Sequence, residues 1–242
     1  MTSKKIEKSD LLWLAQKIVN AYESYGFISA VIFGRQGSGK TTYAFKVARD
    51  VYAYLNQYET KDEAWADVER SYFFELPEAL DRIEVAITTG GRIPVLILDD
   101  ASIWLSKYEW YEDYMKVFYK LYALARLRIT AILFTTPSPE DIAFFLREKG
   151  WYQIRVGWHL KKQRIAEARL YSKEFARNSK GELATKVVAK AIDRFKVDLP
   201  DDFYKRYIEK RRQTEEKLLQ ELKEILSSRR QKEEEVTIGN GG

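Results

Sequence analysis

Residues 28–41 read ISAVIFGRQGSGKT, and this stretch decides the fold. Its first six residues are typical of a strand, and a helical pattern runs from Lys40 to about Tyr54. The loop between them, from Gly34 to Thr41, fits the pattern G-x-x-x-x-G-K-[ST] of a phosphate-binding loop, which requires a strand before it and a helix after it. The sequence therefore predicts a nucleotide site at the end of this strand, with an accidental glycine loop as the alternative.

The loop residues have different tasks in holding a triphosphate. Glycines let successive amides curl around the phosphates, and the following helix presents its positive N-terminus. We expect Lys40 to reach the β- and γ-phosphates as a catalytic residue and Thr41 to offer its hydroxyl to Mg²⁺. The predicted ATP-binding residues are Gly34, Gln36, Gly37, Ser38, Gly39, Lys40, Thr41 and Thr42.

A buried strand that ends in two aspartates supplies the second half of such a site. The apolar run 94–98 precedes Asp99 and Asp100, as in a parallel strand covered on both faces. We expect Asp99 to hold the magnesium ion together with Thr41. Asp100 is the catalytic candidate that orients or deprotonates the attacking water, and it is one methylene shorter than the glutamate that many ATPases carry there. Two solvated acids in a turn are the alternative.

Strand and helix patterns alternate along the chain up to residue 157, which predicts an α/β fold: a parallel P-loop NTPase sheet with helices on both faces, followed by a basic β-hairpin and a C-terminal helix. The predicted domains are a core at 1–157, the hairpin extension at 158–200, an amphipathic helix at 201–232 and a disordered tail at 233–242. The predicted helices of the core are 9–25, 40–54, 76–88, 104–126 and 140–149, and the predicted strands are 28–33, 72–74, 94–98, 129–135, 152–156, 166–175 and 184–195.

The order of these motifs resembles that of the additional-strand ATPases, which include the AAA+ and RecA-like groups. The Asn-Lys-x-Asp element of guanine-specific enzymes is absent, so the resemblance implies ATP as substrate and Mg²⁺ as cofactor. In the AAA+ pattern a polar residue at the end of the fourth strand senses the γ-phosphate. Thr135 and Thr136 stand at that place, with Thr136 taken as the catalytic candidate, and a capping threonine is the alternative.

Residues 139–142 and 146–151 resemble the stretch after the sensor strand in the replication initiator DnaA and its helicase-loader relatives. This resemblance covers residues 28–156 and implies that Arg147 reaches a neighbouring subunit's γ-phosphate, with Arg126 and Arg128 as rivals and a solvated arginine as the alternative. A hairpin pattern replaces the helical lid of AAA+ proteins. The whole is similar to small ATPases carried by archaeal viruses and plasmids, which implies a homo-oligomer that works on DNA, with other replication or packaging proteins as further partners.

The positive charge of the chain is concentrated in residues 155–196, which hold twelve Lys and Arg and four acids, whereas the rest of the chain is net acidic. A charged hairpin face with interleaved aromatic residues suits a nucleic-acid backbone, and an ordinary solvated sheet face is the alternative. The predicted DNA-binding residues are Lys161, Lys162, Arg164, Arg169, Lys173, Arg177, Lys186 and Lys190.

Composition excludes several other classes of protein. The 242 residues contain no cysteine and one histidine, which excludes a disulfide framework and makes zinc or triad chemistry improbable. The sequence has no apolar run of membrane-spanning length and no signal peptide, so we expect a cytoplasmic protein without a membrane partner. The leading interpretation is an oligomeric ATPase in replication initiation, helicase loading, DNA translocation or packaging. A nucleotide-gated partition or regulatory switch and a small-molecule kinase are the alternatives.

Overall fold

The computed structural model describes residues 5–106, 108, 112–149, 151–177 and 182–239, and its centre is a seven-stranded sheet in the order β2-β3-β4-β1-β5-β6-β7. The first five strands in this order run parallel, and β5, β6 and β7 are joined antiparallel. The α/β prediction, with a hairpin after a parallel sheet, is therefore confirmed. The strands are β1 Ile28–Phe33, β2 Tyr72–Phe73, β3 Ile93–Leu98, β4 Ile129–Thr136, β5 Tyr152–Leu160, β6 Ile165–Arg177 and β7 Leu183–Lys196.

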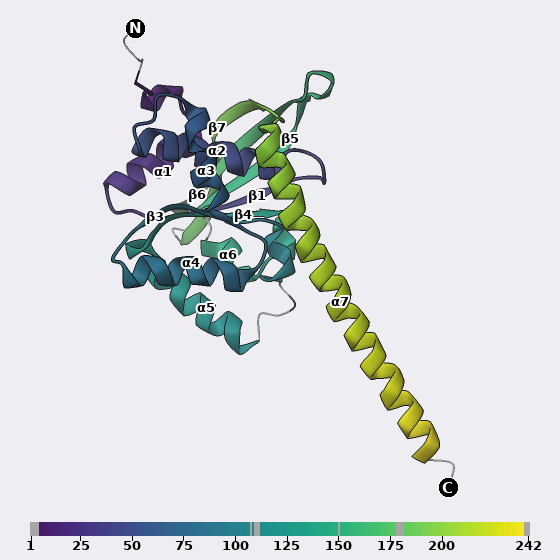
Figure 1. The fold of residues 1–242 in the computed structure, drawn as a ribbon. Helices are drawn as coiled ribbons and strands as arrows, with labels where there is room; N and C mark the ends of the chain where they lie inside the picture. The colour runs from purple at the N-terminus through teal and green to yellow at the C-terminus, as the bar shows by residue number, and fades with distance from the viewer. Residues whose placement is uncertain (1–4, 107, 109–111, 150, 178–181, 240–242) are drawn as a thin grey trace. The chain divides into compact units, whose positions relative to one another are not determined.

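Helices cover both faces of the parallel part of the sheet (Figure 1). On one face α1 and α2 contact β3 and β4, and on the other α4, α5 and α6 share one apolar core with the sheet. The α-helices of this part are α1 Trp13–Glu23, α2 Lys40–Leu55, α3 Trp65–Glu69, α4 Leu76–Thr88, α5 Asp113–Leu124 and α6 Phe144–Lys149. Short 3₁₀ helices are η1 Lys8–Asp10, η2 Lys61–Ala64, η3 Ala101–Ile103, η4 Ala125–Leu127, η5 Pro139–Asp141 and η6 Lys161–Gln163.

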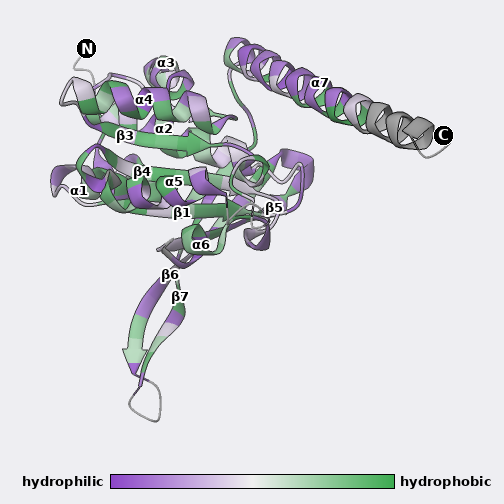
Figure 2. Ribbon diagram, turned by 90° about the horizontal axis from the view of Figure 1, so that it is seen from below, coloured by the Kyte–Doolittle hydropathy of each residue, from purple (hydrophilic) through white to green (hydrophobic). Residues whose placement is uncertain are grey.

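The central strands are apolar because both of their faces are buried, as Figure 2 shows by hydropathy. Every residue of β4 is buried, and Phe134 of this strand packs in one cluster with Ile83 of α4 and Phe118 of α5. This core fixes the carboxyl ends of β1, β3 and β4 at one edge of the sheet, where the phosphate loop begins.

One predicted helix begins later than its sequence pattern, as far as the described residues show, since 107 and 109–111 lie outside them. The apolar spacing of 104–126 predicts a helix throughout, but α5 begins at Asp113. Segment 105–106 pairs with the chain after η5 instead: the Ala143 N–H donates to the Leu105 carbonyl at 2.8 Å, and Ser106 forms an antiparallel bridge with Ile142. This pairing also divides the predicted helix 140–149. Its paired residues, Ile142 and Ala143, lie between η5 and α6.

The hairpin continues the sheet, since β6 pairs with β5 from Tyr152 to Leu160 and with β7 over its whole length. Residues 1–198 form one compact unit, and residues 199–242 form a second. The predicted turn 178–181 lies outside the described residues. The base of the hairpin is packed, with Ala166, Ala168 and Leu170 buried, whereas Phe175 near its tip is 65% exposed.

The second unit is one long helix, α7 Asp201–Gly239. It continues beyond Lys232, where the sequence pattern places the end of the helix and the start of a disordered tail. In the part of the chain that the structure describes, no helix is both long and apolar enough to cross a membrane.

Candidate nucleotide-binding site

Glycines with positive φ give the loop after β1 its shape. Gly34, Gly37 and Gly39 have φ values of 153°, 72° and 93°. A Cβ on Gly34 would lie 2.3 Å from the Val156 carbonyl oxygen, which no real side chain tolerates. The Gly34 N–H donates to the Pro137 carbonyl at 3.3 Å, so the residue after β4 and the middle of β5 hold the start of the loop. Glycine is therefore required at the first position of the motif for close approach of backbone.

Two polar side chains are buried inside the loop. Lys40 is 7% exposed, and its Nζ donates to the Arg35 carbonyl at 3.2 Å. Ser38 is 3% exposed, and its hydroxyl has no hydrogen-bond partner in the structure. Because buried hydroxyls are almost always satisfied, this orphaned group fits a ligand that accepts hydrogen bonds, as a phosphate does.

The other predicted loop residues frame this centre. Gln36 is exposed at the outer side of the loop, and Thr42 is 9% exposed in the first turn of α2. The structure therefore brings all the predicted ATP-binding residues to one edge of the sheet.

Two threonine side chains from different elements contact Asp99, which follows β3. Its carboxylate is fully buried and accepts at Oδ1 from the Thr41 hydroxyl at 2.8 Å and from the Thr135 hydroxyl. Thr41 comes from α2 and Thr135 from β4, so parallel strand ends place them together. The structure thus brings together Thr41 and Asp99, the two predicted metal ligands.

The residues at this point fit a magnesium ion. Mg²⁺ binds oxygen ligands, usually one or two from protein side chains together with substrate phosphates and water. The Thr41 Oγ1 and Asp99 Oδ1 atoms are 2.8 Å apart and lie beside the phosphate loop. Within the described residues no group of three or more His, Asp or Glu forms a separate metal cage. The donor set therefore matches a metal that arrives with a phosphate ligand.

Asp100 differs from its neighbour in both backbone and burial. Its φ and ψ are 48° and 46°, in the left-handed region, where aspartate is better tolerated than most residues. Its N–H donates to Thr135 Oγ1 at 2.9 Å. Asp100 is partly exposed, whereas Asp99 is buried. The turn thus separates a buried carboxylate from one that solvent can reach.

The hydroxyl that contacts Asp99 belongs to Thr135 and not to Thr136, the predicted catalytic threonine. The Thr136 hydroxyl donates to the Ser138 carbonyl at 2.9 Å, within the turn after β4. Successive strand residues point to opposite faces, so only one of the two threonines can contact Asp99. The sequence left both open because the register of β4 against β3 decides which.

The end of β7 reaches the phosphate loop, a contact that the sequence patterns do not predict. A Cβ on Gly39 would lie 2.9 Å from Val197 Cγ2 and 3.5 Å from the Phe195 ring. The Phe195 ring packs 5.2 Å from that of Tyr43 in α2, and Lys46 pairs with Asp198 at 2.6 Å. More than 150 residues separate the loop from Val197 in sequence. No local pattern could have revealed this contact.

Arg147 lies in α6, and an intramolecular ion pair already engages it. Its guanidinium pairs with Glu140 and lies 5.5 Å from the centre of the Phe144 ring, and its side chain is 21% exposed. The rivals Arg126 and Arg128 precede β4, at the amino ends of the parallel strands and therefore at the edge opposite the phosphate loop. Whether any of them acts on a neighbouring subunit stays a prediction.

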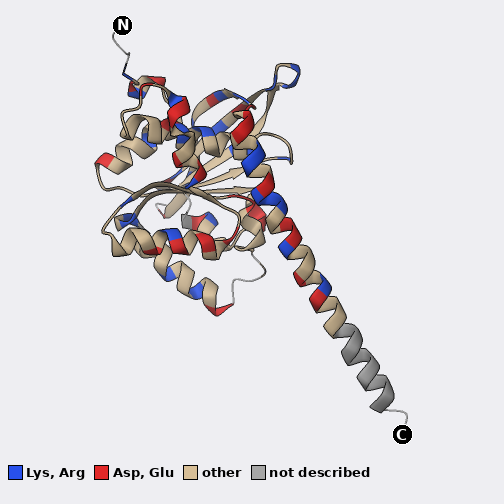
Figure 3. Cartoon of the chain, in the orientation of Figure 1, with Lys and Arg blue, Asp and Glu red and all other residues tan. Residues whose placement is uncertain are grey.

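The predicted DNA-binding residues fall into two groups. Seven are exposed on η6 and the hairpin, where Figure 3 shows Lys and Arg along the strands. They are Lys161, Lys162, Arg164, Arg169, Arg177, Lys186 and Lys190. Arg155 of β5, which the prediction omitted, is exposed directly opposite Arg169, and Arg169 also pairs with Glu167 at 2.7 Å. Like charges directly opposite are unfavourable, and the pair between Arg169 and Glu167 offsets part of this repulsion.

Lys173 and Lys190 are held by acids of the chain itself. Lys173 pairs with Glu148 at 3.3 Å, donates to the Arg147 carbonyl at 2.8 Å, and has a side chain only 10% exposed. Lys190 pairs with Glu174. Both positive charges are therefore paired within the chain, Lys173 in a half-buried position and Lys190 in an exposed one, and their part in DNA binding stays a prediction.

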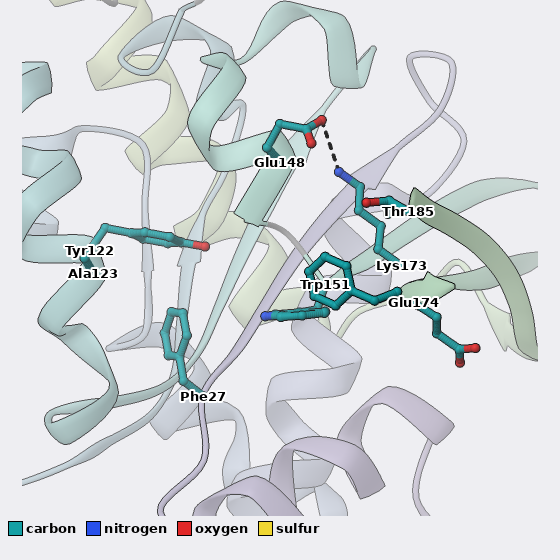
Figure 4. A pocket seen from close by; sticks show the side chains of 9 residues that line it. Phe27, Tyr122, Ala123, Glu148, Trp151, Lys173, Glu174 and Thr185 are labelled. Carbon is teal, nitrogen blue, oxygen red and sulfur yellow. Dashed lines mark hydrogen bonds and ion pairs between the residues drawn. The ribbon is translucent and has the colours of Figure 1, made fainter. Parts of the chain in front are cut away.

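Lys173 lines a cavity of about 450 Å³ between aromatic side chains, shown in Figure 4. Phe27 and Trp151 stand before β1 and β5, so this cavity lies at the amino ends of the strands. It is therefore separate from the phosphate loop, which follows the carboxyl end of β1.

Comparison with known proteins gives two viral relatives, and no family model matches the chain. It is 24% identical over 168 residues to the uncharacterized protein ORF286 of Acidianus two-tailed virus, covering 68% of this chain and 54% of that protein. Among solved structures, the N-terminal domain of zonular occludens toxin from Neisseria meningitidis is similar with a TM-score of 0.42 and 16% identity, over 69% of this chain and 95% of that one.

The stronger likeness is to the uncharacterized protein B-251 of Sulfolobus spindle-shape virus 1. The two sequences are 44% identical over 229 residues, which cover 93% of this chain and 90% of the viral protein. Identity of this extent over nearly the whole of both chains means that they share one fold. The chain therefore belongs to the family of B-251 from Sulfolobus spindle-shape virus 1.

Proposed function

We propose that this chain hydrolyses ATP with the help of Mg²⁺. The observation that carries the proposal is the joined set of Thr41, Asp99 and Thr135 beside a glycine loop whose Ser38 hydroxyl is buried without a partner. Loop amides, Lys40 and the N-terminus of α2 together form an anion site of the kind that holds a triphosphate. ATP is favoured over GTP because the sequence has no guanine-recognition element.

The residues of the site have distinct tasks in this proposal. Lys40 releases the Arg35 carbonyl and donates to the phosphates, while Thr41 and Asp99 hold the metal. Magnesium, when bound, offsets the negative charge that develops on the phosphate oxygens. Asp100, which is partly exposed beside this set, orients the attacking water and accepts its proton. Thr135 fixes both aspartates, since it donates to Asp99 and accepts from the Asp100 N–H.

Steady-state ATP hydrolysis and equilibrium ATP binding, measured on the same variants, test the assignment. Asp100→Asn should bind ATP as the wild type does and lose turnover, because it keeps the size of the side chain and removes the base. Asp198→Asn is the matched control, since Asp198 is a half-exposed acid whose partner is Lys46. Unchanged turnover in Asp100→Asn removes Asp100 from catalysis, and a chain that binds no ATP overturns the proposal.

We further propose that the exposed basic face of η6 and the hairpin binds DNA, as the charge excess of residues 155–196 supports. Lys161, Lys162 and Lys186 are exposed, and Arg155 and Arg169 lie side by side on β5 and β6. Binding to a phosphate backbone by such residues weakens steeply with salt and depends little on sequence.

Duplex DNA binding as a function of salt concentration tests this face. Replacing Lys161, Lys162 and Lys186 with glutamine should flatten the plot of log affinity against log salt by about 0.9 for each phosphate that is no longer neutralised. The matched control replaces Lys173 and Lys190, whose charges are held by Glu148 and Glu174. We expect the control to keep the wild-type slope. Equal slopes for all three proteins contradict the proposed DNA surface.

Stimulation of hydrolysis by DNA distinguishes the tasks that such an ATPase can perform. A translocating or loading motor should hydrolyse ATP faster when duplex DNA is added, whereas a nucleotide-gated switch should turn over slowly with and without it. The glutamine variant should hydrolyse ATP at the wild-type rate when no DNA is present. None of its three positions belongs to the phosphate loop or to the set of Thr41, Asp99 and Thr135.

A further inference from the structure

Helix α7 carries a row of exposed apolar side chains along one face. Tyr204, Ile208, Leu222 and Ile225 are 50%, 41%, 52% and 54% exposed. Scattered exposed apolar residues are ordinary, but a row that follows one helix face is typical of a helix that packs against another helix.

The spacing of this row is that of a coiled coil. Its positions follow one another at alternating steps of four and three residues, which keeps them on one seam of a slightly supercoiled helix. In order along the chain they are Tyr204, Ile208, Arg211, Glu215, Leu218, Leu222 and Ile225. Apolar positions thus flank a charged centre.

The charged centre decides the direction of a partner helix. Within one helix Arg211 pairs with Glu215 at 3.2 Å and donates to the Tyr207 hydroxyl at 3.2 Å. Two parallel copies would place arginine against arginine and glutamate against glutamate at the seam, and like-charge pairs there are unfavourable. Two antiparallel copies centred between these positions place each Arg211 against a glutamate.

We propose that α7 pairs antiparallel with α7 of a second copy of this chain. Arg211 then faces Glu215 of the partner subunit, Ile208 faces Leu218 of the partner subunit, and Tyr204 faces Leu222 of the partner subunit. All three layers follow from one register, because each pair has its midpoint at residue 213. The same register satisfies both the apolar and the charged positions.

Charge along the rest of the helix agrees with this direction. Residues 205–212 contain five basic residues and one acid, whereas residues 215–224 contain four acids and two lysines. An antiparallel pair lays the basic segment of each copy along the acidic segment of the other. Opposite charges at the edges of a helix pair set partner choice and orientation.

The pairing goes beyond the proposed ATPase function and does not rest on it. Every residue involved belongs to α7, and none belongs to the phosphate loop or to the set of Thr41, Asp99 and Thr135. Its tests therefore use the full chain without nucleotide, and their failure leaves the ATPase proposal standing.

Charge reversal, followed by sedimentation equilibrium, gives the first test. The wild type should dimerise, and Arg211→Glu or Glu215→Arg alone should weaken the dimer by tenfold or more, because each puts like charges in two layers. The double reversal of both residues should restore it, and a mixture of the two single variants should form heterodimers. Glu209→Arg is the control, since it breaks the exposed pair with Arg212 away from the seam and should leave dimerisation unchanged.

A monomeric wild type at concentrations up to about 0.1 mM overturns the proposal. So does a double reversal that stays as weak as the single variants. Circular dichroism of each variant separates loss of the helix from loss of the dimer.

Disulfide trapping gives the direction, and the absence of native cysteine makes it clean. A mixture of Ile208→Cys and Leu218→Cys chains should form an intermolecular disulfide under mild oxidation, whereas each variant alone should not. Each variant chain carries a single cysteine, so every disulfide that forms joins two chains. Cross-linking of Ile208→Cys with itself indicates a parallel pair and contradicts the proposed direction.

Discussion

Two buried aspartates, Asp99 after β3 and Asp193 on β7, each accept a hydrogen bond from a side chain in the first turn of α2. Thr41 donates to Asp99 at 2.8 Å, and Tyr43 donates to Asp193 at 2.6 Å. Asp193 also accepts from the Trp13 N–H at 2.9 Å. One carboxylate lies at the phosphate loop, and the other ties the hairpin to α1 and α2.

The two aspartates differ in whether a ligand could replace the groups that donate hydrogen bonds to them. Asp99 accepts hydrogen bonds from two threonine hydroxyls, and in the proposed function a metal ion takes the place of these donors. Asp193 receives a backbone N–H and a buried phenol, which no ligand can displace without moving a helix. Burial raises the pKa of Asp193, and the Tyr43 hydroxyl and the N–H groups of Trp13 and Leu14 oppose that rise. A buried carboxylate is therefore not by itself a sign of catalysis.

The largest expected effect is on ATP hydrolysis, at the edge of the sheet that carries Asp99 and the phosphate loop. Lys40→Ala and Asp99→Asn should each lower ATP turnover by about a thousandfold, because each removes a charge that stabilises the transferring phosphoryl group. Thermal melting should show that both variants stay folded. Turnover near wild type in either one breaks the assignment of this edge as the nucleotide site.

A large effect on stability, and not on chemistry, is expected at Asp193. Asp193→Ala leaves the Tyr43 hydroxyl and the Trp13 N–H without an acceptor and should lower the free energy of unfolding by about 3 kcal/mol. Asp198→Ala is the control, because the pair with Lys46 is half exposed and should be worth less than about 1 kcal/mol. Urea unfolding measures both. Equal losses in the two variants contradict the structural role of Asp193.

A smaller effect separates the two threonines at the end of β4. Thr135→Val should lower turnover by about tenfold to a hundredfold, because Asp99 loses a donor and the Asp100 N–H loses its acceptor. Thr136→Val removes only a hydrogen bond to the Ser138 carbonyl and should change turnover little. If Thr136→Val is the slower enzyme, the choice of Thr136 from the sequence pattern is right.

The smallest expected effect is a pH dependence of stability through Asp193. Folding raises the pKa of Asp193 above its ordinary value of 3.8, so the folded chain keeps this proton to a higher pH than the unfolded chain does. The contribution of Asp193 to stability therefore falls as pH rises above about 4. The stability of the wild type relative to Asp193→Asn should therefore decline as pH rises from about 4 to 7, by less than about 1.4 kcal/mol for each unit of pKa shift. Urea titrations at several pH values measure it, and a difference that grows with pH contradicts burial as the cause.

Local sequence was sufficient where an element and its neighbours in the chain carry their own signals. The strand 28–33 and the helix 76–88 are found with the predicted bounds, because a β-rich run and a Pro at the first turn are local features. It was insufficient for α1, whose predicted start at Ser9 is wrong by four residues. The Leu12 N–H donates to Asp50 and the Trp13 N–H to Asp193, acids that lie 38 and 180 residues further along the chain.

The sequence by itself determined the strand-loop-helix of the phosphate site, the Asp99 position and the basic hairpin, because backbone propensity, glycine spacing and charge act over a few neighbouring residues. Only the tertiary structure decided that Thr135 contacts Asp99, that Val197 covers Gly39 and that Lys173 is bound by Glu148. These contacts depend on strand register and on which acid lies within reach after packing. No short stretch of the sequence determines the strand register or the acid that a lysine reaches after packing.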